Sequence, residues 1–230
     1  MNICIIPARG GSKRIKKKNI KNFCGRPIIL WSIQVAKQSE CFDKIIVSTD
    51  DTEIKDLSIE NGAEVPFIRP AQLSDDFTGT VPVVAHAIKW QIKYFKKPTY
   101  VCCLYPTAPF LKPEDLKTGL EKLKNISAEY VFSATEYNYP IQRSFRILSD
   151  ERVEMFKQEH MNTRSQDLEQ AFHDAGQFYW AETDVWLKEK PVLGKNSAVV
   201  KLPKFRVQDI DTNDDWIKAE LMFSAYKTIK

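Results

Sequence analysis

The chain has 230 residues, 43% of them hydrophobic, which is enough for one compact domain with its own core. Its 34 basic and 30 acidic residues leave a net charge of only +4, so the chain lacks the strongly basic character of a dedicated nucleic-acid-binding protein. No apolar run reaches the roughly 18 residues of a membrane span, and nothing at the amino terminus resembles a signal peptide, so we expect no membrane partner. The five cysteines lack CxxC spacing, so we expect reduced thiols in a cytoplasmic protein.

Short apolar runs alternate with helical patterns along the first part of the chain. A continuous apolar run bounded by turn residues is typical of a strand that is buried on both faces. Such runs predict strands at residues 2–7, 44–50, 63–68, 99–106 and 129–137. Proline starts, acidic first turns and a closing glycine predict helices at residues 27–39, 51–62, 80–95 and 113–125. Strands that alternate with helices indicate an α/β fold with a mostly parallel sheet and helices on both faces.

This alternation stops after Tyr137. Residues 138–175 are polar, rich in Arg, Gln and His, and without a sustained period, so we expect an excursion from the sheet. Residues 176–187 return as a strand and a turn, and residues 204–229 are typical of a strand, an acidic turn and an amphipathic helix. We find no repeat or linker, so the prediction is a single domain over residues 1–230.

A basic loop follows the first predicted strand, with seven Lys or Arg among residues 9–21. This order places the loop at the carboxyl edge of the sheet, where open parallel α/β sheets bind their ligands. Gly10 and Gly11 let the backbone approach a ligand closely. Donors suited to phosphate oxygens come from Arg9, Ser12, Lys13 and Lys18. The loop matches neither the GxGxxG nor the Walker pattern, which disfavours those two kinds of nucleotide pocket.

The other cations of the loop have a simpler interpretation, because charge runs are usually solvated surfaces. That interpretation stays open for Arg14, Lys16, Lys17 and Lys21. A nucleic-acid-binding module would use the segment KRIKKK to track phosphates, but this needs a wider basic face than the rest of the chain offers. We therefore expect a small nucleotide as the partner and no nucleic acid.

The segment IPARGGSKRIKKKN resembles the opening motif of the cytidylyltransferases that activate nonulosonic acids, the CMP-nonulosonic acid synthetases. The segments FDKIIVSTDD, FIRPAQLSDDFTGT, LYPTAPFL and DIDTNDD resemble later motifs of that family in the same order, so the resemblance spans nearly the whole chain. Within the family, PIQRSFRI and NTRSQDLEQAFHDAGQFYW look most like the enzymes that act on pseudaminic acid.

The resemblance implies a Rossmann-like nucleotide-diphospho-sugar transferase sheet and a nucleotidyltransferase activity. In the implied reaction, CTP and a sialic-acid-like nine-carbon sugar give a CMP-sugar and pyrophosphate, for bacterial surface glycan or flagellin glycosylation. The nearest alternatives are the synthetases for CMP-sialic acid and for CMP-keto-deoxy-octulosonic acid.

The resemblance also assigns roles to single residues. Arg9 and Lys18 are implied to be catalytic, because fixed cations neutralise the departing pyrophosphate. The implied nucleotide site consists of Ala8, Arg9, Gly10, Gly11, Ser12, Lys13, Asn19, Arg69, Ser74 and Thr78. For Arg69, a surface turn beside Pro70 remains the alternative.

Two carboxylates lie near the carboxyl end of the chain, in the tripeptide DID. In an extended strand, residues two apart point to one face, so Asp209 and Asp211 can hold one Mg²⁺ or Mn²⁺ while Ile210 points into the core. Hard oxygen ligands suit a divalent ion that bridges phosphates. The alternative is that this acidic segment only caps the last helix. The family resemblance favours the metal site.

The acceptor sugar carries a carboxylate, hydroxyls and acylated amines, so its site needs cationic or amide groups and some apolar surface. Related sialic acid enzymes have Gln where this chain has Tyr105, and that Gln contacts the sugar, so the departure argues against sialic acid itself. A structural role stays open for His173. The predicted sugar site consists of Tyr105, Gln142, Arg143, Arg164, His173, Asp174, Gln177 and Tyr179.

The excursion also offers aromatic residues for a partner. Phe145, Phe156, Phe172 and Trp180 suggest an arm that packs on a second copy of the chain, and the family resemblance implies a homodimer. We therefore predict residues 138–175 to be a sugar-binding and dimerisation insertion within one cytidylyltransferase domain.

Overall fold

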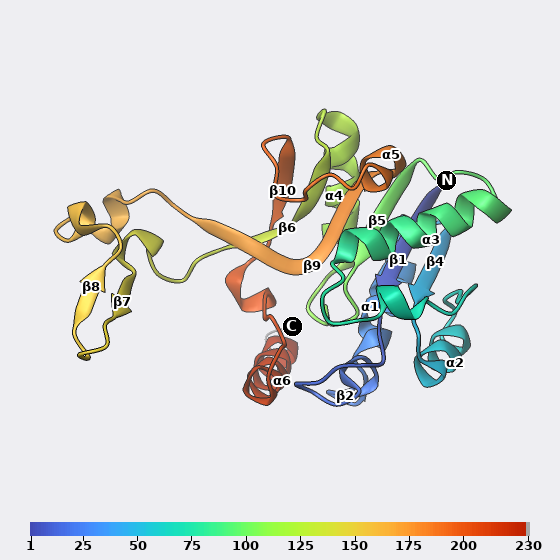
Figure 1. Cartoon of the computed structure of the whole chain (residues 1–230), viewed down its shortest axis with the longest axis horizontal. Helices are drawn as coiled ribbons and strands as arrows, with labels where there is room; N and C mark the ends of the chain where they lie inside the picture. The colour runs from blue at the N-terminus through green and yellow to red at the C-terminus, as the bar shows by residue number, and fades with distance from the viewer. Residues whose placement is uncertain (229–230) are drawn as a thin grey trace.

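A computed structural model describes residues 1–228, and its centre is a six-stranded sheet in the order β10-β6-β9-β5-β1-β4 (Figure 1). The strands are β1 (Asn2–Pro7), β4 (Lys44–Ser48), β5 (Tyr100–Leu104), β6 (Tyr130–Glu136), β9 (Phe172–Glu182) and β10 (Ser197–Lys201). β1 pairs in parallel with β4 and β5, and β6 pairs in parallel with β10. The mostly parallel sheet that the sequence predicts is therefore confirmed.

β9 runs antiparallel to both of its neighbours, β5 and β6. The chain leaves the sheet at the end of β6, forms an arm and returns at the same edge, as the ribbon in Figure 1 shows. A strand that returns without a crossover has to run in the opposite direction to the strand that left. The arm therefore accounts for the reversed strand between β5 and β6.

Helices cover both faces of the sheet, as predicted. One face carries α1 (Ile29–Ser39), α2 (Thr52–Glu60) and α4 (Pro113–Asn125), and the other carries α3 (Thr80–Tyr94) and α5 (Thr183–Leu187). In β1, Cys4 and Ile6 are buried on the first face, and Ile3 and Ile5 on the second. Burial on both faces explains why the strands have continuous apolar sequences. Among residues 1–228, no helix has the length and apolar character needed to cross a membrane.

The last helix, α6 (Asn213–Thr228), packs on the small amino-terminal hairpin of β2 (Asn22–Phe23) and β3 (Arg26–Pro27). The ring of Phe23 lies 5.5 Å from that of Trp216 and 5.4 Å from that of Phe223, both in edge-on contacts. Ile210 is buried in the same cluster. This packing brings the acidic segment before α6 next to the basic loop.

Two predicted strands are absent from the described part of the chain. Residues 63–68 form only the isolated bridges Ile46 to Glu64 and Thr49 to Ile68, because a proline within the segment cannot donate to a ladder. Residues 204–206 form a 3₁₀ turn that places Arg206 inside the protein. The predicted end of the last helix at residue 229 lies outside the described residues.

Residues 138–171 form an arm that projects away from the body of the molecule (Figure 1). The arm contains a short hairpin of β7 (Phe145–Ile147) and β8 (Val153–Met155), flanked by 3₁₀ turns. Residues 172–175, predicted as part of the excursion, already belong to β9. Trp180 is not an arm residue, contrary to the prediction, because it is fully buried in the sheet and stacked on Phe42.

Candidate active site

The basic loop after β1 folds back on the acidic residues that follow β4. Gly10 donates its backbone N–H to Asp50 Oδ1 at 2.9 Å, and a Cβ atom at this position would lie 2.6 Å from Asp51 Oδ2. Asp51 is itself fixed, because it caps α2 by accepting from the backbone N–H groups of Glu53 and Ile54. Gly10 therefore has a packing role, since any side chain there would collide with a helix cap.

A cleft of about 230 Å³ opens beside this loop, at the carboxyl edge of the sheet. Its lining brings together residues from distant parts of the chain, among them Arg9, Ser12, Lys13, Arg14, Lys18, Asn19, Arg69, Thr78, Thr80, Tyr105 and Asp211. Four residues of the predicted nucleotide site lie outside this lining: Ala8, which is buried in the core, and Gly10, Gly11 and Ser74. Asn19 is buried and donates to the Arg9 carbonyl at 2.9 Å, so it also holds the loop in place.

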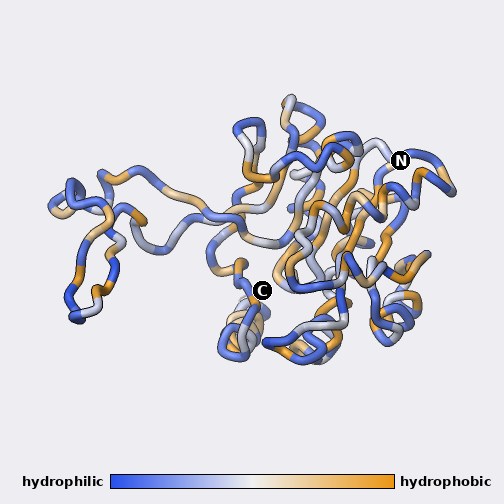
Figure 2. Tube along the Cα trace, in the orientation of Figure 1, coloured by the Kyte–Doolittle hydropathy of each residue, from blue (hydrophilic) through white to orange (hydrophobic). Residues whose placement is uncertain are grey.

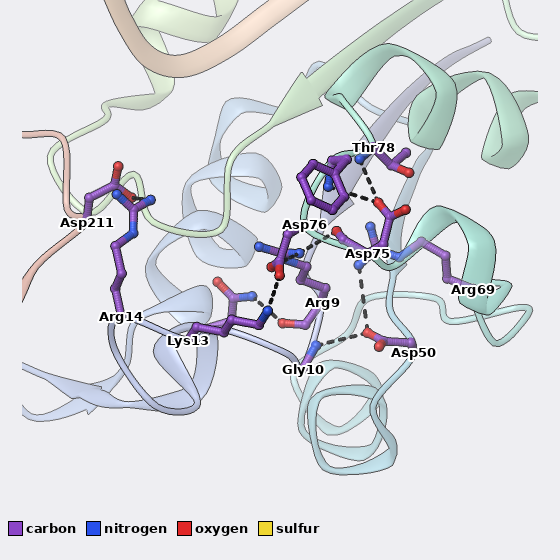
Figure 3. A network of polar contacts seen from close by, with 12 residues as sticks. Arg9, Gly10, Lys13, Arg14, Asp50, Arg69, Asp75, Asp76, Thr78 and Asp211 are labelled. Carbon is purple, nitrogen blue, oxygen red and sulfur yellow. Dashed lines mark hydrogen bonds and ion pairs between the residues drawn. The ribbon is translucent and has the colours of Figure 1, made fainter.

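An acidic side chain that was not predicted from the sequence pairs with two cations of the cleft lining. Asp76 pairs with Arg9 and Lys13 (Figure 3), and its carboxylate oxygens lie 2.8 Å from Arg9 Nη1 and 2.5 Å from Lys13 Nζ. Arg9 also donates to the carbonyl oxygen of Asp75, whose side chain accepts from the backbone N–H of Thr78. The Lys13 ammonium and the Arg9 guanidinium hold the pKa of Asp76 below its usual range. Two of the predicted phosphate-binding cations thus share one carboxylate of the same chain as their partner. The adjacent acids in the segment SDDF were the available signal.

Arg69 is a buried cation in the cleft lining. Its side chain is only 4% exposed, and its Nη2 atom lies 3.9 Å from Asp50 Oδ1. Burial lowers the pKa of Arg69, with Asp50 opposing this effect and Arg9 adding to it. Its Nε and Nη2 atoms have no hydrogen-bond partner in the described part of the chain. The alternative of a surface turn is therefore wrong, and the guanidinium has donors to offer an anion.

The acidic tripeptide meets the basic loop on the opposite side of the cleft. Lys18 Nζ donates to the carbonyl oxygen of Ile210 at 2.7 Å and lies 3.3 Å from Asp211 Oδ1. Arg14 Nη2 lies 3.0 Å from the same Asp211 oxygen (Figure 3). Asp209 is exposed and lies outside the cleft lining, and partial desolvation together with the Asp211 charge raises its pKa. The two carboxylates flank buried Ile210 as predicted, although the segment is not a strand.

Other groups cap the last helix. Asp215 Oδ2 accepts from the backbone N–H groups of Asp211 and Thr212, and the Thr212 hydroxyl accepts from the Asp215 N–H. This reciprocal pair satisfies the first turn of α6. Because the Asp211 carboxylate faces cations instead, the helix-cap alternative does not account for it.

The remaining loop cations lie outside the cleft lining. Lys16 is exposed, Lys17 pairs with Glu53, and the Lys21 ammonium lies 4.4 Å from the centre of the Trp216 ring. The solvated-surface interpretation thus fits Lys16 best, while Lys17 and Lys21 hold the loop against neighbouring elements.

The predicted sugar residues are divided between the cleft, the sheet and the arm. Tyr105 lines the cleft, and Tyr179 and Asp174 lie behind it on β9. Gln177 is buried and donates to the Arg206 carbonyl at 2.8 Å, which is a structural contact. His173 Nδ1 lies 2.8 Å from the Asp174 carbonyl oxygen, and its ring packs on Tyr137, so this histidine also has structural partners.

Three further sugar predictions fall on the arm. Gln142 donates to the Glu169 carbonyl, Arg143 contacts the Thr163 carbonyl, and Arg164 pairs with Asp167. These contacts stay within the arm, and none of the three residues lines the cleft. Among the described residues, Tyr105 is thus the single predicted sugar residue in the cleft lining.

The chain is similar to known proteins over nearly its whole length. Residues 3–208 match a protein-family model described as "Cytidylyltransferase". The chain is 44% identical to "Pseudaminic acid cytidylyltransferase" of Campylobacter jejuni, over 96% of this chain and 96% of that protein. It is 29% identical to "Post-translational flagellin modification protein B" of Campylobacter coli, over 96% of this chain and 94% of that protein.

The fold is also similar to solved structures. A CMP:2-keto-3-deoxy-manno-octonic acid synthetase in complex with CTP superimposes with a TM-score of 0.71, over 98% of this chain and 99% of that chain, at 15% identity. At 15% identity, this structural similarity shows a common fold and does not identify substrates.

Proposed function

The chain belongs to the cytidylyltransferase family, and we propose that it transfers the cytidylyl group of CTP to pseudaminic acid, a sialic-acid-like nine-carbon sugar. One observation carries this proposal, the 44% identity to the Campylobacter jejuni pseudaminic acid cytidylyltransferase over nearly the whole of both chains. The cation-lined cleft at the carboxyl edge of the sheet supports it, because a triphosphate needs such a surface.

The reaction is a substitution at phosphorus. A sugar hydroxyl oxygen attacks the α-phosphorus of CTP, a new P–O bond forms, and the bond from the α-phosphorus to the bridging oxygen breaks. The electron pair leaves with pyrophosphate, and the hydroxyl proton passes to water. Negative charge grows on the departing group, so fixed cations in place beforehand lower the barrier. Arg9, Lys13 and Lys18 line the cleft and are the cations we assign to this task, with Arg9 and Lys18 as catalytic residues.

We also propose a Mg²⁺ or Mn²⁺ site at Asp209 and Asp211. Both are hard oxygen donors, Asp211 lines the cleft, and repulsion between the two carboxylates contributes to the raised pKa of Asp209. Within residues 1–228, no cluster of three or more His, Cys, Asp or Glu side chains could hold a metal alone. Phosphate oxygens and water would therefore supply the other ligands. A bound ion would neutralise part of the triphosphate charge.

A homodimer is the assembly we propose for the arm. A two-stranded hairpin is marginally stable alone, so β7 and β8 need a surface to pack on. Figure 2 shows hydrophobic positions along the trace of the arm. The large hydrophobic residues of the arm that are exposed by more than half are Tyr139, Phe145, Ile147, Val153, Phe156 and Met161. Light scattering should give twice the chain mass, and Ile147→Glu combined with Phe156→Glu should give monomers with an intact fold.

We propose the cytoplasm as the compartment, because all five cysteines are free thiols. The similarity to the Campylobacter coli flagellin modification protein supports a place for the product in flagellin or surface glycan glycosylation.

Pyrophosphate release tests the function directly. Purified protein is incubated with CTP, Mg²⁺ and, separately, pseudaminic acid, sialic acid or keto-deoxy-octulosonic acid. The proposal expects the highest kcat/KM with pseudaminic acid. Preference for either other sugar would assign the chain to that branch of the family. No turnover with any sugar, together with oligonucleotide binding that falls steeply with salt, would favour the nucleic-acid alternative.

A further inference from the structure

Arg14 is a cation of the basic loop to which the family resemblance assigns no role. The solvated-surface interpretation does not account for it, because Arg14 lines the cleft, whereas Lys16 is exposed and lies outside the lining. The Arg14 Nη2 atom lies 3.0 Å from Asp211 Oδ1, and Arg14 has no other ion pair within residues 1–228. Arg14 therefore belongs to the charged groups of the site.

Hydrophobic packing brings Arg14 and Asp211 together. Their chain neighbours Ile15 and Ile210 are 2% and 1% exposed, and both belong to one buried cluster with Trp216. Each charged residue is thus anchored by an apolar side chain next to it. The Arg14 side chain itself is 67% exposed, so it has room to adopt another rotamer while its backbone stays in place.

Two cations share one oxygen atom of Asp211. Lys18 Nζ lies 3.3 Å from Asp211 Oδ1, the same atom that Arg14 contacts. Lys18 is only 21% exposed and also donates to the Ile210 carbonyl at 2.7 Å, so a second contact holds it in position. Arg14 is more exposed and has the carboxylate as its one ion-pair partner among the described residues. Of the two cations, Arg14 is therefore the one that can leave Asp211.

The cation before Arg14 in the chain also has an acidic partner. Lys13 pairs with Asp76, which pairs with Arg9 as well. Neighbouring residues of the loop thus meet acids from distant parts of the chain, as Figure 3 shows for Lys13 with Asp76 and for Arg14 with Asp211. Because phosphate oxygens are acceptors for the same donors, a triphosphate in the cleft competes with these carboxylates.

We propose that Arg14 is a further triphosphate-binding residue, which leaves Asp211 when a divalent ion binds that carboxylate. The ion and Arg14 compete for Asp211, because two positive charges beside one oxygen repel each other. A triphosphate offers the released guanidinium several oxygens that match its planar set of donors. This inference rests on the proposed function, because it takes CTP and a divalent ion as ligands of this cleft.

Arg14 thereby couples the binding of the two ligands. An ion at Asp211 releases Arg14 for the phosphates, and phosphates that bind Arg14 leave Asp211 open to the ion. By linkage, each ligand raises the affinity for the other by the same factor. Without nucleotide, Arg14 opposes the ion, so the protein alone should bind a divalent ion weakly.

Arg14→Gln tests the inference in two binding measurements that need no sugar. Electron paramagnetic resonance measures Mn²⁺ binding without nucleotide, and the variant should bind Mn²⁺ roughly fivefold more tightly than the wild type, because Asp211 has lost a competing cation. Calorimetry measures CTP binding at saturating Mg²⁺, and the variant should bind CTP roughly tenfold more weakly, because one charged contact with the phosphates is lost. The unfolding midpoint should stay unchanged, since the side chain is exposed.

Lys13→Gln is the matched control. It removes the same charge one position earlier in the loop, but Lys13 pairs with Asp76 instead of Asp211. This variant should weaken CTP binding, whereas its Mn²⁺ affinity without nucleotide should change by less than about twofold. Adding Asp211→Asn to Arg14→Gln should remove the gain in Mn²⁺ affinity, because the gain depends on that carboxylate.

Three outcomes overturn the inference. They are an Mn²⁺ affinity that does not rise in Arg14→Gln, an equal rise in Lys13→Gln, which would be a general effect of charge, and unchanged CTP binding by Arg14→Gln. The proposed function fails in a different way, namely if the wild-type protein binds CTP and Mn²⁺ but turns over none of the sugars.

Discussion

Arg206 and Asp115 form a two-pronged ion pair in the interior of the protein, with Nη1 to Oδ2 at 2.6 Å and Nη2 to Oδ1 at 3.0 Å. Both side chains are nearly inaccessible, 8% and 11% exposed. Asp115 also accepts from the backbone N–H of Lys112 at the start of α4, and the Arg206 carbonyl accepts from Gln177. The pair therefore anchors the segment that leads to Asp209 and Asp211 to a helix and to the sheet.

Arg206→Met should destabilise the fold strongly. The substitution leaves the Asp115 carboxylate buried without its partner, which typically costs about 3–5 kcal/mol. Urea unfolding at a fixed protein concentration measures the change. Adding Asp115→Asn should restore part of the stability, because it removes the unpaired charge. Asp184→Asn is the control, since its pair with Lys97 is exposed and its loss should change little. A small effect of Arg206→Met would show that the pair does not anchor the segment.

Arg9→Ala should lower kcat on the order of a hundredfold, because Arg9 is assigned to charge stabilisation at the departing pyrophosphate. The unfolding midpoint should stay close to that of the wild type, since the side chain lies at the mouth of the cleft. Lys97→Ala removes the same charge in the segment before β5, at the opposite edge of the sheet, and should leave kcat unchanged. Pyrophosphate release by Arg9→Ala at the wild-type rate would remove Arg9 from the mechanism.

Asp76→Asn should lower KM for CTP severalfold. In the free protein Asp76 pairs with Arg9 and Lys13, so a triphosphate that binds these cations has to displace a carboxylate. The lowered pKa of Asp76 means that it stays charged below the usual Asp range, so the difference from the wild type should persist in neutral and mildly acidic buffers. Initial rates over a range of CTP concentrations measure it. A higher KM would mean that Asp76 organises the loop for the nucleotide.

Asp209→Asn and Asp211→Asn should each reduce activity strongly at low Mg²⁺ and recover part of it at high Mg²⁺. Asn keeps the shape of the side chain and removes one negative charge, so the loss reports on metal affinity. Asp214→Asn removes an exposed charge in the first turn of α6 and is the matched control. Full activity of both variants at low Mg²⁺ would place the ion, if any, elsewhere.

CTP should be preferred over UTP by more than about a hundredfold in kcat/KM, because a site built to hydrogen-bond the exocyclic amine leaves uracil with unpaired groups. Backbone groups of the cleft are the expected readers of the base. Deoxy-CTP keeps the base and should remain a far better substrate than UTP. Equal use of UTP and CTP would contradict a cytidylyltransferase.

Local chemistry determined those elements that the sequence predicted well. The helix Pro113–Asn125 begins at the proline and acids that predict its start, and it has the predicted bounds. The strand Asn2–Pro7 coincides with its apolar run. These signals operate within a few residues, so the sequence records them directly. Residues 63–68 have a similar apolar run but form only isolated bridges to Ile46 and Thr49, because a proline within the segment cannot donate to a ladder.

Tertiary structure alone decided the partners within the site. Lys18 meets Asp211 across 193 positions of the chain, and Arg9 meets Asp76 only because the segment after Arg69 folds over the loop. The sequence identified Lys18 and Asp211 by type and family resemblance, whereas the adjacent acids in SDDF did not indicate which cations Asp76 would pair with. Such contacts depend on distances between elements, which packing of the sheet, the arm and the last helix sets.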